Sequence, residues 1–300
     1  MAITNVAAVT ADLQTYFARK LLVLAQKDLV FKQFGNQEPI PSNSSKTISF
    51  TQYSKLATVS TPLTDGVTPT DTALANTAIT ATVDQLGAFV TLTDLAELTV
   101  KHPIMQKTLE ILGMQAGESI DVAISTVLLA GTGVQYANSK ANRAALATAD
   151  VMTSTEIRKA VKTLRRNGAM PLDGGSYVLV VDPEVEADLL ADTTFVTAAS
   201  YSAITKLYNG EVGTWFGVRV VRSNNLSTIA STTTVHTSVL LGMNAYAVSD
   251  LQSLETFIEG PGSNSDPLHQ RRTVGWKVAF KSVILNNNFM LRIESGSNYN

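Results

Sequence analysis

The sequence predicts an α+β fold that is organised around one long helix. Residues 103–131 have the periodicity of a single amphipathic helix, and extended segments precede and follow it. Helix and strand patterns alternate between residues 150 and 255, as in a self-contained subdomain built around a sheet. No catalytic group stands out on the long helix, so the pattern indicates a structural spine.

The predicted spine helix contains no proline after Pro103, which suits the first helical position because its missing N–H would have no partner there. Gly131 is placed to end the helix in a left-handed cap. Gly113 and Gly117 each cost about 1 kcal/mol of helix propensity relative to alanine. Either they are accidental weak points, or a neighbouring element crosses there too closely to admit a side chain. The apolar face consists of Ile104, Leu109, Leu112, Ala116, Ile120, Ile124, Val127 and Leu128.

The composition is that of a globular chain with few charges. Its 300 residues can bury a substantial core as one large domain or two smaller ones. Hydrophobic residues make up 45% and charged residues only 16%, against roughly a quarter in typical soluble domains. Either other subunits cover much of the surface, or that surface is rich in Thr, Ser and Asn. The net charge of −2 indicates neither a sequence-reading basic surface nor a polybasic membrane anchor.

Without cysteine, the chain can form no disulfide, thiolate zinc site or thiol nucleophile. Its first residues lack the charged start and long apolar core of a secretory signal. The apolar run at residues 21–25 is far too short to span a bilayer. These features predict a soluble protein that is made and kept in the cytoplasm.

Residues 1–45 are predicted to form an arm that lies on another surface. A first helix is expected over residues 12–28, with Leu13, Phe17, Leu21 and Leu24 on one face. Two prolines, at positions 39 and 41, then impose an extended path.

Residues 46–92 are predicted to form two long strands joined by a wide loop. Apolar residues alternate with polar ones on both strands, and the alternation shifts near residues 84–87, which indicates a bulge or bend. The loop is rich in threonine and contains an Asp65-Gly66 turn signal. It is either a disordered surface excursion or the tip of a projecting β-hairpin, and the flanking strands favour the hairpin.

Residues 94–99 predict a short helix, and residues 132–150 a loop. Thr153 then opens a helix, and Glu156 completes a capping box with it. The outer face of this helix carries a basic strip, which is either a phosphate-contacting surface or a solvated face or subunit contact. The absence of interleaved aromatic residues favours the second interpretation. The basic strip consists of Arg158, Lys159, Lys162, Arg165 and Arg166.

The remaining elements are mostly strands. Asp182 is expected to cap a helix that runs to Leu190, and three asparagines at positions 286–288 can turn the last strand back into residues 289–293. The strands are predicted at residues 177–181, 217–225, 234–241 and 273–285.

The sequence offers no pattern of a catalytic, cofactor or metal site. His102, His236 and His269 lie in unrelated contexts, without a second ligand residue at helical or hairpin spacing. GxSxG, P-loop and GxGxxG patterns are absent. The acidic residues at positions 182–188 complement the start of a helix dipole and need no functional explanation. The sequence therefore predicts a protein without enzymatic activity, cofactor or metal.

The order of these parts resembles that of the major capsid proteins of tailed bacteriophages. Several blocks are similar to those of podoviruses of the large-polymerase coliphage type, among them TPLTDGVTPTDTALANTAITATVDQLGAFVTLTDL, TSTEIRKAVKTLRRNGAMPLDGGSYVLVVDPE and DPLHQRRTVGWKVAFKSVILNNNFMLRIESG. The resemblance implies the Hong Kong 97-type capsid fold. In that fold, residues 1–45 would be the N-terminal arm, 46–92 the extended loop, 93–149 with 256–300 the peripheral domain, and 150–255 the axial domain.

The resemblance also implies a function. Copies of the chain would assemble in the host cytoplasm, as pentamers and hexamers, into the icosahedral capsid that encloses the double-stranded DNA of a virion. The implied partners are other copies, a separate scaffolding protein, a portal and non-specifically contacted DNA, while a cement protein is left open. An encapsulin-like cellular nanocompartment uses the same fold and is the alternative, and a soluble enzyme is the third. Candidate subunit contacts are Leu13, Phe17, Leu21, Leu24, Lys55 and Asp65.

Some capsids of this fold link a lysine of the extended loop to an asparagine of a neighbour, and this chain has Lys55 and the three asparagines. We predict no such link, because the reaction needs a neutral lysine beside a carboxylate that can move protons. Glu294 is the only carboxylate in the last strand pair. Its alternation with Leu291 and Ile293 predicts that it lies on the opposite, wetter face.

Overall fold

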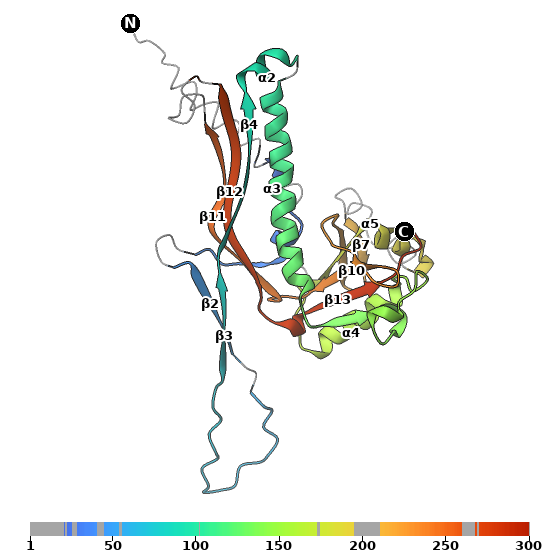
Figure 1. Ribbon diagram of the computed structural model, residues 1–300. Helices are drawn as coiled ribbons and strands as arrows, with labels where there is room; N and C mark the ends of the chain where they lie inside the picture. Colours follow the sequence, from blue (N-terminus) through green and yellow to red (C-terminus); the bar gives the residue numbers. More distant parts are fainter. Residues whose placement is uncertain are drawn as a thin grey trace.

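The computed structural model describes residues 21, 23–25, 29–40, 45–53, 56–101, 103–172, 175–194, 211–259, 268 and 270–299. Within them, two sheets flank a long helix, and a hairpin projects from the body (Figure 1). The mixture of helix and sheet agrees with the predicted α+β class. No helix in this part of the chain is long and apolar enough to cross a membrane.

The spine helix is α3 (Ile104–Leu129). Pro103 occupies the N-cap, so the helix begins one residue later than predicted. It ends before Gly131, but that residue does not adopt the predicted left-handed conformation. A β-carbon at Gly113 would lie 3.2 Å from the carbonyl oxygen of Leu21, and one at Gly117 would overlap the carbonyl of Ala25. Residues 21 and 23–25 are helical, so part of the predicted first helix is confirmed and crosses α3 there. The close-approach interpretation of the two glycines is therefore correct.

Beside α3 runs a four-stranded sheet with the order β1-β11-β12-β4 (Figure 1). Its centre is the antiparallel pair β11 and β12, which shifts register between Asp250 and Glu255. Trp276 of β12 is buried toward α3, where its indole N–H donates to Gln115 Oε1 at 3.4 Å. Alternate β12 residues therefore face the helix and the outer surface. The strands are β1 (Asn36–Gln37), β11 (Tyr246–Glu259), β12 (Arg271–Ile284) and β4 (Asp84–Thr93).

The predicted hairpin is formed by β2 (Thr47–Tyr53) and β3 (Asn76–Thr82), which pair in register from Thr47↔Thr82 to Tyr53↔Asn76. The chain then changes sheets, because β4 begins at Asp84 and pairs with β12. The shift in alternation near residues 84–87 therefore marks a passage between sheets and not a bulge within one strand. Figure 1 shows the hairpin and its loop extending away from both sheets.

The second sheet has the strand order β5-β13-β10-β6-β8-β7, with β9 also paired to β10. Its seven strands are β5 (Val134–Tyr136), β13 (Met290–Ser295), β10 (Thr234–Leu241), β6 (Tyr177–Val181), β8 (Val218–Arg222), β7 (Glu211–Trp215) and β9 (Ile229–Ala230). One face packs against α4 (Ser154–Arg166) and α5 (Pro183–Ala191). The opposite face shares one hydrophobic cluster with α3 and the four-stranded sheet. The two sheets are thus joined by a common core.

Several details differ from the sequence predictions. The asparagine run does form a turn, continued by η6 (Asn287–Phe289), but β13 pairs with β10 and β5 instead of folding back on β12. The segment predicted as a loop at residues 132–150 contains β5 and the 3-10 helices η2 (Ala137–Ser139) and η3 (Arg143–Ala145). Helix α4 begins after Thr153 as expected, yet the Thr153 side chain makes no capping bond. Asp192 instead accepts the N–H of Ser154 at 2.8 Å.

The other short elements agree with the sequence. Helix α2 (Asp94–Thr99) has the predicted bounds, and Thr93 caps it. Asp182 caps α5 by accepting the N–H of Val185 at 3.0 Å. A 3-10 helix, η1 (Phe31–Phe34), precedes β1.

Candidate functional site: exposed contact surfaces

The structure places the six predicted subunit contacts in different environments. Leu13, Phe17 and Lys55 lie outside the described residues. Asp65 is exposed in the hairpin loop, where Gly66 adopts a left-handed turn conformation with φ +77°. Leu21 is 0% exposed, in the cluster that contains α3. Its expected role as a contact with a neighbouring subunit is therefore wrong, because its own chain covers it completely, while Leu24 is half-buried beside Gly113.

The segment from residue 29 to 40 is fixed to its own chain by buried polar contacts. The N–H of Phe31 donates to Asp121 Oδ1 of α3 at 2.8 Å, and the Tyr246 hydroxyl donates to the Phe31 carbonyl. Asn225, which follows β8, donates to Asp121 Oδ2 at 3.0 Å. Burial raises the pKa of the Asp121 carboxyl, although these hydrogen bonds act in the opposite direction. One carboxylate thus joins the arm, the spine helix and the second sheet.

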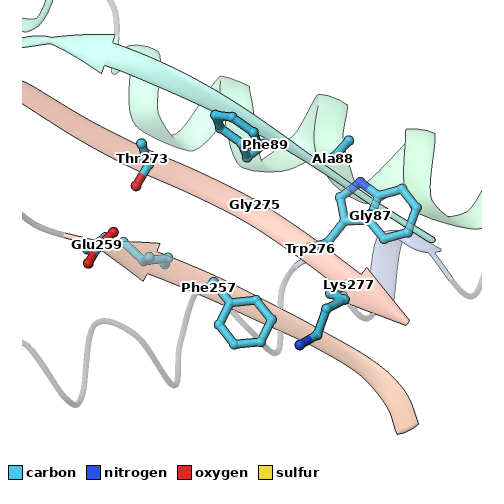
Figure 2. A pocket seen from close by; sticks show the side chains of 10 residues that line it. Gly87, Ala88, Phe89, Phe257, Glu259, Thr273, Gly275, Trp276 and Lys277 are labelled. Carbon is cyan, nitrogen blue, oxygen red and sulfur yellow. The ribbon is translucent and has the colours of Figure 1, made fainter. Parts of the chain in front are cut away.

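The outer face of the four-stranded sheet has an apolar groove, with a volume of about 680 Å³. Gly275 lies between Phe89 and Phe257 in the strand register, and it leaves space between the two rings. Figure 2 shows Phe89 and Phe257 beside this gap, with Lys277 reaching over the Phe257 side. The Lys277 ammonium lies 5.1 Å from the centre of the Phe257 ring, within cation–π range. Phe89 is 73% exposed and Phe257 48%, so nothing in the described chain covers the groove.

The hairpin loop, residues 56–75, is the second uncovered apolar surface. Every residue in it is exposed, and the described backbone forms no helix or strand there. Scattered exposed apolar side chains are normal, but contiguous exposed apolar surface marks a contact site. The loop presents five large ones: Leu56, Val59, Leu63, Val67 and Leu74.

Further exposed apolar side chains lie on α2 and on the first half of α3. They are Leu95, Leu98, Ile111 and Met114. The groove and the hairpin loop are carried by different elements of an elongated molecule, so they can contact different neighbours. Sequence reasoning missed the groove, because it depends on residues from β4, β11 and β12 that meet only through strand pairing.

Glu294 corrects another prediction. It is 0% exposed, whereas its alternation indicated a wetter face. The Arg143 guanidinium donates to both carboxylate oxygens at 2.7 Å, and Arg292 Nε lies 2.9 Å from Oε1. A buried carboxylate that is paired twice in this way is a structural ion pair, and it is not available to move protons at the surface.

Two of the three asparagines use their side chains to hold the turn. Asn286 Oδ1 accepts the N–H of Asn288 at 3.0 Å, and Asn287 Oδ1 accepts the N–H of Thr132 at 3.0 Å. Their main role is therefore to shape the passage from β12 to β13.

His236 has neighbours that the sequence did not indicate. Ligand atoms of Asp182, Glu184 and His236 all lie within 4.8 Å of one another. However, Asp182 Oδ1 caps α5, and Oδ2 is hydrogen-bonded to the buried His236 ring. Both oxygens are used in this arrangement, which ties β10 to the start of α5. His102 and His269 lie outside the described residues.

Comparison with known proteins gives the chain a context. A family model described as phage capsid protein matches residues 75–286. No curated protein matches. The capsid of Ralstonia phage GP4 is 15% identical, with 87% of each chain covered and a TM-score of 0.71. The capsid of cyanophage Pam1 is 15% identical, covering 86% of this chain and 87% of that one, with a TM-score of 0.68.

A solved structure from outside the phages is also similar. The virus-like particle from Pyrococcus furiosus is 10% identical over 94% of this chain and 99% of that one, with a TM-score of 0.57. At such identities the likeness establishes the fold alone.

Proposed function

Because the chain belongs to the phage capsid protein family, we propose that it assembles as pentamers and hexamers into an icosahedral shell around double-stranded DNA. The chain is a major capsid shell protein with the Hong Kong 97-type fold that its sequence indicated. The encapsulin-like alternative is less favoured, because the likeness to the virus-like particle is weaker than that to the phage capsids above. The family is structural, and we infer no enzymatic activity.

The observation that best supports assembly is the pair of uncovered apolar surfaces on opposite parts of one chain. We propose that the hairpin loop of one copy lies across the groove of a neighbour, with its apolar side chains over Gly275. Such a contact is heterologous, because the loop and the groove are different surfaces, and heterologous contacts close into rings. Asp65 of the loop and Lys277 of the groove have opposite charges, which favours a register that brings Asp65 to Lys277 and not to Glu259, the other charged residue of the lining.

The division into domains is a further part of the proposal. We assign α3 and the four-stranded sheet to the peripheral domain, and the seven-stranded sheet with α4 and α5 to the axial domain. Strands β5 and β13 pair within the second sheet, so they join the axial domain although the sequence ranges placed them in the peripheral one. Likewise β11 begins at Tyr246, ten residues before the predicted boundary at 256, and it pairs with β12.

The virion is the place where a capsid protein acts. Assembly in the host cytoplasm, a separate scaffolding protein and a portal belong to the proposal, and they rest on the family resemblance. The partner that the structure itself points to is another copy of the chain.

Electron microscopy of the full chain, expressed with the phage's scaffolding protein, tests the proposal. The wild type should form closed shells. Phe89→Ser should leave the subunit folded, because this side chain is mostly exposed, but should reduce the yield of shells at least tenfold. Leu190→Ser is the matched control, since Leu190 is an exposed apolar residue of α5 outside the groove.

Melting temperatures of both variants equal to that of the wild type would show that neither is misfolded. Recovery of only monomers or dimers from the wild type would overturn the shell proposal. A normal yield of shells from Phe89→Ser would show that the groove is not a contact between copies.

A further inference from the structure

The outer face of α4 concentrates positive charge that the apolar contact surfaces do not use. Five of its 13 residues belong to the basic strip, in a chain with 23 lysines and arginines. Their spacing places them along one face of the helix. The inward face of α4 packs against the seven-stranded sheet through Ile157, Val161 and Leu164. The basic strip therefore points away from the core.

A solvated helix face does not account for this strip. Such faces normally mix both signs, because like charges four residues apart destabilise a helix. Arg158, Lys162 and Arg166 follow one another at that spacing. The helix dipole favours cations only in the last turn, so it explains Arg165 and Arg166 but not the three charges further back.

The strip also forms a hollow with the chemistry of an oxyanion site. Its volume is about 220 Å³, and its lining is Lys159, Lys162, Thr163, Arg166 and Asn167, without a carboxylate. Lys159 is held by Glu156 at 2.8 Å and Ser139 at 2.9 Å. Among the described residues, Lys162 and Arg166 have no carboxylate partner. The Lys162 ammonium and the Arg166 guanidinium thus line the hollow without a carboxylate partner, and such groups are suited to phosphate oxygens.

The densest acidic run in the described part of the chain is a poor match for the strip on a neighbouring copy. The densest acidic run is residues 182–188, yet Asp182 and Asp188 are buried, and Glu186 lies 3.6 Å from Arg222. A partner that carries many phosphates fits better. Duplex DNA has about one negative charge per 1.7 Å of its axis. The strip spans about 12 Å at about 1.5 Å per residue, so it faces several phosphates at once.

We propose that the basic strip of α4 binds backbone phosphates of the packaged double-stranded nucleic acid, which places this face of the axial sheet on the inside of the shell. The inference rests on the proposed function. Contacts of this kind position a polyanion without reading its sequence, and in a chain whose net charge is −2 they depend on the local basic strip.

The test uses the full chain before assembly and a short fluorescent duplex DNA, with the binding constant measured across a series of salt concentrations. Each phosphate contact contributes about 0.9 to the slope of log K against log salt. The double variant Lys162→Gln/Arg166→Gln should therefore lower the magnitude of that slope by roughly 1.8. The matched control, Lys101→Gln/Lys107→Gln, changes the charge equally on an exposed segment near the start of α3 and should leave the slope unchanged. Should the double variant fail to fold, Lys162→Gln alone should give about half of the change.

The outcomes separate this inference from the proposed function. An unchanged slope in the strip variant, or no binding of duplex by the wild type at low salt, would overturn the inference. A strip variant that binds DNA normally but forms no shells would show that the strip contacts another copy instead, and it would overturn the inference as well. Wild-type shells seen by microscopy test the proposed function independently of either result.

Discussion

Gly117 decides how closely the first helix approaches α3. A β-carbon there would overlap the Ala25 carbonyl, so Gly117→Ala must push the two segments apart. Overpacking of a core costs about 1–3 kcal/mol, whereas the better helix propensity of alanine returns about 1 kcal/mol. We expect a net loss in the free energy of unfolding, measured by urea denaturation of the unassembled chain. Gly113→Ala is the control, because its β-carbon would meet neighbours at 3.2 Å and should cost less. Equal stability of Gly117→Ala and the wild type would contradict the close approach.

Single residues also show which features the sequence predicts and which it does not. The spacing of Gly113 and Gly117 was readable, because both residues lie on one predicted helix face. The burial of Glu294 was not, because its partner Arg143 is 151 residues away and only the fold brings them together. Asp182 and His236 meet in the same way across 54 residues. Local periodicity contains no information about such distant charge pairs.

At the scale of elements, the hairpin loop can be removed without disturbing the strands that carry it. Tyr53 and Asn76 are paired at the end of β2 and β3, so an Asn-Gly turn can replace residues 54–75. We expect the shortened chain to keep its melting temperature, since the loop residues that the structure describes are exposed, and to lose shell assembly. Calorimetry and electron microscopy measure the two effects. Shells of normal yield would show that the loop is not a contact between copies.

Elements themselves were predicted well where one period runs without interruption. β6 and β10 have the bounds that their apolar patterns indicated, and α3 starts one residue later and ends two residues earlier than the predicted 103–131. Strand partners were harder to predict. The asparagine turn suggested that β13 would fold back on β12, yet β13 joins the other sheet. Pairing depends on which hydrophobic face finds a core, and that is a property of the whole chain.

For the whole molecule, we predict that assembled shells are held without covalent links between chains. The asparagine side chains at 286 and 287 already accept hydrogen bonds in the turn, and the Glu294 carboxylate is buried against Arg143. Neither group is free to serve a lysine from a neighbour. Mature particles boiled in detergent should give a single band near 32.0 kDa on a denaturing gel. A ladder of larger bands would show that a cross-link forms.

The hydrophobic cluster shared by both sheets has a mechanical consequence. Close-packed cores resist gradual deformation, so the angle between the two sheets is fixed by the cluster around α3. A closed shell nevertheless bends more sharply at some vertices than along its flat facets. The chain offers one place to absorb that difference, where Val83 connects the hairpin to β4. Val83 packs with Ile40 and Ala279 in a small cluster separate from the core around α3, and the Lys281–Asp84 ion pair, at 2.7 Å, lies beside it. We expect the curvature of the particle to be set by the swing of this hairpin against an otherwise stiff subunit.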